Sequence, residues 1–191
     1  DLSDVGYDAF LANGKQESLL KVLPNRTVRI RLINSAASSY FNVEFAGGPM
    51  TVVSADGVDV EPIKVKRLRI AIAETYDFVL TVPDSQAYEL RATAEDGTGY
   101  SSTFIGSGQK VLAPDIHKPN LLSMGHSMHK AHKMGTMEKD THTMHNTMKK
   151  NKTSDVGTVE YMNDYKHLRA LKSTQFMREK KVREVVLELT G

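Results

Sequence analysis

Cysteine and tryptophan are both absent from this chain of 191 residues, and long apolar runs are absent as well. Without cysteine the chain can form no disulfide, no catalytic thiolate, no zinc site built on thiolates and no blue-copper centre. Because no stretch approaches the roughly 18 consecutive apolar residues that a bilayer requires, the sequence predicts no membrane-spanning helix. We therefore expect neither redox-active sulfur chemistry nor a membrane partner.

Positive charge is scarce outside one segment. The formal net charge is +2, yet residues 123–153 alone hold six lysines against two acidic residues. The rest of the chain contains 19 basic and 21 acidic residues. The basic segment has no aromatic residue, whereas nucleic-acid-binding surfaces usually interleave basic and aromatic side chains on a folded face. We therefore predict no nucleic-acid partner.

The first 115 residues have the pattern of an all-β domain. Short apolar runs recur from residue 8 to residue 105 and are separated by Asn, Gly, Pro and Asp. This rhythm is typical of an antiparallel sandwich, and seven or eight strands fit the length. Val28, Ile30 and Leu32 alternate with two arginines, which predicts a strand with one buried face. The predicted fold is a Greek-key β-sandwich.

Residues 116–153, here called the Met/His segment, differ abruptly in composition. Apolar residues other than methionine are almost absent, so we predict disorder without a ligand. Six of the nine methionines and five of the seven histidines lie between residues 124 and 148. These eleven candidate metal ligands are Met124, His126, Met128, His129, His132, Met134, Met137, His142, Met144, His145 and Met148.

The mixture of thioether and imidazole favours copper. Thioether sulfur is a soft ligand that needs no deprotonation, which suits Cu(I), while imidazole extends the range to Cu(II), Ni(II) and Zn(II). Methionine also remains usable in a compartment that would oxidise thiols, which fits the absence of cysteine. Redundant ligands allow several coordination sets, so the sequence selects no single one. The alternative interpretation is a plain polar linker with incidental methionines.

Residues 154–191 form a third region. The pattern predicts a short helix over residues 161–171 and a strand over residues 182–189. A lone strand is unstable in water, so the second element either completes the first sandwich or belongs to a following domain. We favour the following domain, which would make the chain an internal fragment.

Several motifs resemble a known family. The sequences YDAFLANG (residues 7–14), LPNRTVRIRLIN (residues 23–34) and PMTVVSADG (residues 49–57) look like the second cupredoxin domain of bacterial multicopper oxidases. The sequences IAIAETYD (residues 70–77) and DYKHLRAL (residues 164–171), together with the Met/His segment, resemble the periplasmic copper-resistance protein A family. The resemblance covers nearly the whole chain.

The resemblance implies a domain without catalytic copper. Members of the family hold their catalytic copper ions through motifs of the first and third domains, and no stretch of this sequence matches those motifs. It also implies a periplasmic parent enzyme that oxidises Cu(I) or phenol-like donors and reduces dioxygen to water. The chain would be its structural middle domain, inactive alone, with copper ions and the first and third cupredoxin domains as partners. Its Met/His segment would bind Cu(I), and residues 183–191 would open the third domain.

Two other functions stay open at this point. The chain could be a stand-alone copper carrier or sequestration protein without oxidase activity, built from a sandwich and a metal-binding segment. It could instead be an interaction module with a plain linker, which predicts no metal binding at all.

Overall fold

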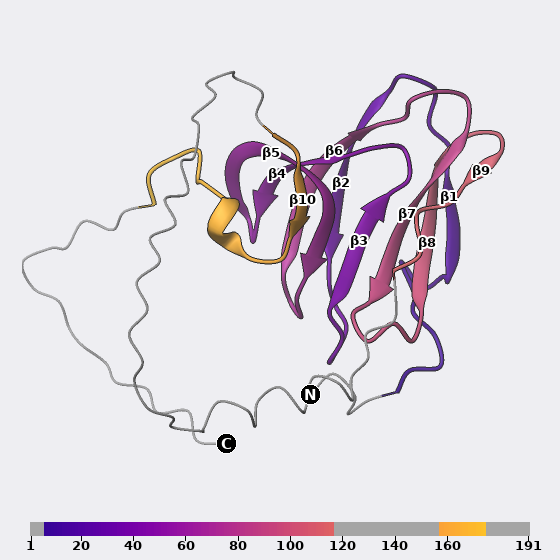
Figure 1. Cartoon of the computed structure of the whole chain (residues 1–191), viewed down its shortest axis with the longest axis horizontal. Helices are drawn as coiled ribbons and strands as arrows, with labels where there is room; N and C mark the ends of the chain where they lie inside the picture. The colour runs from indigo at the N-terminus through magenta and orange to yellow at the C-terminus, as the bar shows by residue number, and fades with distance from the viewer. Residues whose placement is uncertain (1–5, 117–156, 175–191) are drawn as a thin grey trace, which may run out of the picture.

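The computed structural model describes residues 6–116 and 157–174, and these residues form a curled β-sheet with a single short 3-10 helix (Figure 1). The strands are β1 (Glu17–Leu20), β2 (Thr27–Ile33), β3 (Phe41–Phe45), β4 (Met50–Ala55), β5 (Val58–Ile70), β6 (Thr75–Thr81), β7 (Ala87–Ala94), β8 (Tyr100–Gly106), β9 (Lys110–Val111) and β10 (Val159–Met162). The 3-10 helix, η2, spans Tyr165–His167.

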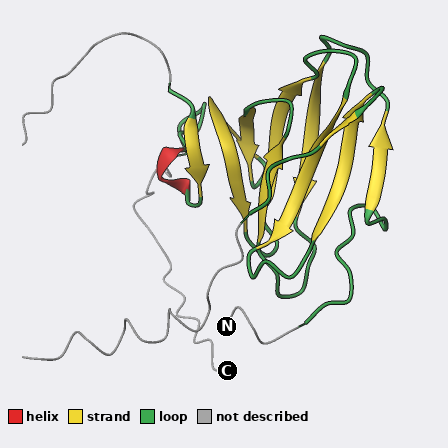
Figure 2. Cartoon of the chain, turned by 45° about the vertical axis from the view of Figure 1, so that its right-hand side comes forward, coloured by secondary structure: helices red, strands yellow, loops and turns green. Residues whose placement is uncertain are grey.

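Neighbouring strands of the sheet are mostly far apart in sequence. The order is β1-β8-β7-β3-β5-β4-β6-β2, with β9 beside β7 and β10 beside β5. Strand pairs are antiparallel except β1 with β8, β9 with β7 and β10 with β5. The turned view shows the curl of the sheet (Figure 2). Buried apolar side chains form one core within it. This arrangement confirms the prediction of an all-β, cupredoxin-like fold for the described residues.

The core follows from alternation along the strands. In β2, Val28, Ile30 and Leu32 pack against the core while the residues between them are exposed, as the sequence pattern predicts. The largest side chains that are almost fully buried include Phe78, Met50, Leu68, Ile70, Ile105 and Met162. One of these, Met162, comes from a strand that follows the Met/His segment. The core is therefore completed by chain on both sides of that segment.

Two turns have the residue types that their backbone conformation requires. Asn13 and Gly14 both have positive φ, 51° and 77°, and the flanking residues Ala12 and Lys15 exchange two backbone hydrogen bonds. Asp56 and Gly57 likewise have φ of 45° and 78° and join β4 to β5. Asn-Gly and Asp-Gly favour these turns because both central residues tolerate left-handed backbone.

The predicted helix over residues 161–171 is wrong. Residues 159–162 form strand β10 on β5, and only Tyr165–His167 are helical, as one 3-10 turn. Asp164 caps that turn by accepting a hydrogen bond from the Lys166 N–H, and the chain then returns to extended backbone at Leu168. Pairing with β5 outweighs the local preference for a helix.

Ala73 offers a stability test in the turn between β5 and β6. It is exposed, has φ of 63°, and its N–H donates to the Asn34 carbonyl oxygen at 3.0 Å. Left-handed backbone costs alanine about 1–2 kcal/mol, whereas glycine loses only about 0.5–1 kcal/mol of extra chain entropy. We expect Ala73→Gly to raise the free energy of unfolding by up to about 1 kcal/mol in urea denaturation.

Ala37 provides the control for that substitution. It is also exposed, but its φ is not positive. Glycine there relieves no strain, so Ala37→Gly should lower the free energy of unfolding slightly. Equal losses for the two variants would show that the left-handed conformation of residue 73 carries no cost.

Candidate functional site

All eleven predicted metal ligands, residues 124–148, lie outside the described residues. Within residues 6–116 and 157–174, no group of three or more His, Cys, Asp or Glu side chains is placed to hold a metal ion. The one histidine in these ranges, His167, is exposed on η2. The described structure therefore brings none of the predicted ligands together, and the Met/His site stays a prediction.

The structure does define where the chain leaves the sheet before the Met/His segment. After β9, the Ala113 N–H donates to Glu89 Oε2 at 2.8 Å, and Arg91 forms an ion pair with Asp115. Ala113 is buried, whereas the Asp115 side chain is almost fully exposed. Residues 113–115 thus run along β7 and are held there by two charged side chains of that strand.

Glu89 and Arg91 form a buried ion pair on the outward face of β7. Their exposed fractions are 1% and 4%, and Arg91 Nε donates to Glu89 Oε1 at 3.0 Å. Ser102 also donates to Glu89, and the Tyr100 ring lies 4.4 Å from the Arg91 guanidinium carbon. Burial alone would lower the pKa of Arg91, but hydrogen bonds to Glu89 and Asp115 raise it above its ordinary value.

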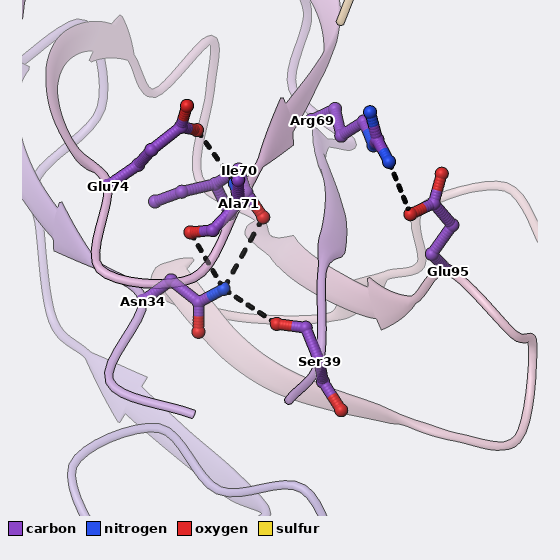
Figure 3. A network of polar contacts seen from close by, with 7 residues as sticks. All are labelled: Asn34, Ser39, Arg69, Ile70, Ala71, Glu74 and Glu95. Atoms are coloured by element: carbon purple, nitrogen blue, oxygen red, sulfur yellow. Dashed lines mark hydrogen bonds and ion pairs between the residues drawn. The ribbon is translucent and has the colours of Figure 1, made fainter. Parts of the chain in front are cut away.

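A second polar network fixes the turn between β5 and β6 (Figure 3). The Asn34 amide is buried, and its Nδ2 donates to the carbonyl oxygens of Ser39 at 2.8 Å and Ala71 at 3.0 Å. The Ala71 N–H in turn donates to Glu74 Oε2 at 2.7 Å. Each of these buried polar atoms has a partner, which holds the turn in one conformation.

The other carboxylate oxygen of Glu74 contacts the chain that follows the Met/His segment. The Tyr165 hydroxyl lies 2.6 Å from Glu74 Oε1 and 2.8 Å from Asp56 Oδ2. Both ends of the Met/His segment are therefore anchored on one domain, the first on β7 and the second on β5 and its turns.

Sequence reasoning missed both anchors. Glu89 and Arg91 were not singled out from the sequence, although two opposite charges two residues apart in a strand share one face and can pair. Their burial depends on residues 113–115 covering them, which no local pattern indicates. The Tyr165 contacts join residues 91 and 109 positions apart in sequence.

A groove of about 900 Å³ lies between the two ends of the curled sheet. Its lining includes Leu20 of β1, Ile30 and Leu32 of β2, and Leu90 of β7. On the β1 side, the Ser18 and Thr103 hydroxyls are hydrogen-bonded to each other at 3.0 Å. The lining of the groove is mixed, because Arg29, Arg31 and Asn34 also border it.

These features define the class of the protein: an all-β, cupredoxin-like domain with an apolar core and no metal-ligand cluster among the described residues. Residues 4–111 match the sequence model of the family described as multicopper oxidase. That match covers more than half of the chain. The chain therefore belongs to the multicopper oxidase family.

Individual relatives agree with this assignment. The chain is 39% identical over 133 residues to copper resistance protein A of Escherichia coli, a match that covers 65% of this chain and 22% of the relative. It is 35% identical over 111 residues to multicopper oxidase MmcO of Mycobacterium tuberculosis, covering 56% and 22%. The chain thus spans about a fifth of the length of these relatives.

Solved structures with similar folds carry lower identities. Fet3p, a multicopper oxidase that functions in iron import, matches 57% of this chain and 23% of its own, with 16% identity and a TM-score of 0.49. The blue copper oxidase from Nitrosomonas europaea matches 55% and 36%, with 19% identity and a TM-score of 0.48. In the described residues, no helix is long and apolar enough to cross a membrane.

The described residues of this chain do not fit a catalytic copper centre. The whole sequence lacks cysteine, and the described ranges hold a single exposed histidine. A type 1 copper site needs a thiolate, and the other catalytic copper ions of such enzymes need clustered imidazoles. We therefore derive no oxidation step from the described side chains.

Proposed function

We propose that this chain is the structural middle domain of a periplasmic copper-resistance oxidase and that its Met/His segment binds Cu(I). One observation carries the proposal: eleven Met and His residues lie within 25 positions, in the same chain as a multicopper oxidase domain. Copper resistance in the names of the relatives supports the same role. In this proposal the parent enzyme oxidises Cu(I) or phenol-like donors with dioxygen, and the domain itself is inactive.

The chemistry assigned to the segment is capture. Thioethers bind Cu(I) without releasing a proton, so the methionines can take up the ion over a wide pH range. The histidines add stronger donors that compete with protons near pH 6.5, which predicts tighter binding above that pH than below it. The partners proposed for the domain are the first and third cupredoxin domains of the parent.

Because the chain is anchored on β7 before the Met/His segment and on β5 after it, the segment can be replaced by a linker while both anchors stay in place. β7, β3, β5 and β10 are consecutive in the sheet, so the two anchored ends of the chain are separated by three strand spacings, about 14 Å across the sheet. A linker of about ten Gly and Ser residues can extend to about 33 Å and thus replaces residues 117–156 without strain.

We expect the intact chain to compete with a colorimetric chelator for Cu(I) under anaerobic conditions and the linker variant to fail. Neither chain should consume dioxygen faster than a protein-free control when Cu(I) or a phenol is supplied in air. Equal competition by both chains, or by neither, would contradict the assignment to the Met/His segment. Dioxygen consumption by the isolated chain would contradict its role as a non-catalytic domain.

A matched variant separates thioether from imidazole binding. Replacing the six methionines of residues 124–148 with leucine keeps side-chain size and leaves all five histidines in place. We expect Cu(I) competition to fall sharply while Cu(II) or Zn(II) binding is retained. Unchanged Cu(I) competition would assign capture to the histidines alone.

A further inference from the structure

The chain that follows the Met/His segment lies along the full length of β5. In β10, Val159, Tyr161 and Met162 pair in parallel with Val65, Arg67 and Leu68. Further along, the Glu61 N–H donates to the Arg169 carbonyl oxygen at 2.7 Å, and the Leu171 N–H donates to the Asp59 carbonyl oxygen at 2.9 Å. Backbone pairing therefore holds residues 157–171, here called the strap, at both ends of β5.

Side chains of the strap add an apolar anchor and several polar contacts. Met162 is fully buried in the domain core, and Val159 and Leu168 pack against the same core. Arg67 lies over the Tyr161 ring at 5.8 Å from its centroid. A fully buried methionine in the core contributes more to such an attachment than any single exposed ion pair.

Tyr165 clamps the strap to the turns beside β4 and β6. Its ring stacks on Tyr76 with centroids 6.3 Å apart, and its hydroxyl lies between the carboxylates of Asp56 and Glu74. Burial, followed by these two hydrogen bonds, raises the pKa of Tyr165 far above its ordinary value. The hydroxyl therefore stays protonated and remains a donor at any physiological pH.

We propose that the surface along β5 is a peptide-docking site that retains the strap without a covalent connection through residues 117–156. Its occupant is an extended peptide that pairs with the β5 edge, inserts one long apolar side chain as Met162 does, and presents a tyrosine three positions later, as Tyr165 does. The Met/His segment is then an insertion within one domain, because its two ends return to the same core. This proposal does not depend on metal binding.

Cutting the polypeptide tests the proposal on the full chain. A protease recognition sequence is inserted after Gly135, the purified chain is cleaved, and both halves are followed by gel filtration and mass spectrometry. We expect the two fragments to elute together at micromolar concentration and to separate only in denaturant. Release of the C-terminal fragment in native buffer would overturn the proposal, whether or not the remaining part stays folded.

Substitutions in the strap identify the contacts that retain it. After cleavage, Met162→Ala and Tyr165→Phe should each release the C-terminal fragment on dilution, and circular dichroism of the uncut variants checks that both fold. If Met162→Ala does not fold, Tyr165→Phe alone decides the question. Glu160→Gln, which removes an exposed ion pair with Lys66, should release nothing. Retention in all three variants would overturn the assignment of these contacts.

Discussion

Glu89→Ala is expected to lower the free energy of unfolding by about 3–5 kcal/mol, because it leaves the buried guanidinium of Arg91 without its main counter-charge. Arg91 is 4% exposed, and its remaining carboxylate partner, Asp115, is almost fully exposed to solvent. The same substitution leaves the Ala113 N–H and the Ser102 hydroxyl without their acceptor. Urea denaturation followed by circular dichroism measures the loss.

A double substitution distinguishes the net contribution of the ion pair to stability from the stability lost when only one partner is removed. Replacing a buried ion pair with apolar residues of similar size is often neutral for stability, whereas removing one partner is not. We therefore expect Glu89→Leu combined with Arg91→Met to recover much of the loss seen in Glu89→Ala. The exposed pair Lys110 and Glu17 is the control, and Lys110→Ala should cost less than about 1 kcal/mol. Similar losses for Glu89→Ala and Lys110→Ala would contradict the anchoring role of Glu89.

The sandwich was predictable because its signals are local. Alternation at Val28, Ile30 and Leu32 specifies a strand with one buried face, and Asn13-Gly14 specifies a tight turn, whatever the rest of the chain does. The strap was not predictable in this way. Residues 159–162 form a strand only because β5, about 90 positions earlier, offers a free edge and a core site for Met162.

The candidate site also has a part that local sequence indicates and a part that depends on contacts between distant residues. Composition alone predicts the eleven Met and His residues as ligands, because coordination chemistry depends on ligand type and needs no predicted fold, and this set stays a prediction. The buried pair on β7 escaped prediction, because a charged residue in a strand is ordinarily read as solvent-facing. That face of β7 is buried because residues 113–115 lie along it. Those residues are in turn held there by contacts with Glu89 and Arg91.

Gly106 lies where β8 ends and the chain turns toward β9, and its replacement should be among the most damaging in the domain. Its φ is 127°, a region that is essentially restricted to glycine, and a Cβ built there would lie 2.0 Å from the Gln86 carbonyl oxygen. The obstructing atom is backbone next to Ala87, which pairs with both Gly106 and Lys110. The substitution cannot be accommodated without separating β7 from its neighbours.

We expect Gly106→Ala to lower the free energy of unfolding by about 3 kcal/mol or more, since strain and a backbone clash add. Gly14→Ala is the matched control, because Gly14 also has positive φ, 77°, but nothing lies within 4 Å of its Cβ position. It should cost only the strain, about 1–2 kcal/mol, in the same urea denaturation.

Hydrogen exchange of the Ala113 amide gives a second measurement. If β9 is displaced, it draws Ala113 away from Glu89, so exchange of this amide should accelerate in Gly106→Ala and stay unchanged in Gly14→Ala. Equal losses of the free energy of unfolding in the two variants would show that the Gln86 carbonyl moves to accommodate the new Cβ. They would also show that the turn after β8 does not fix the start of the Met/His segment.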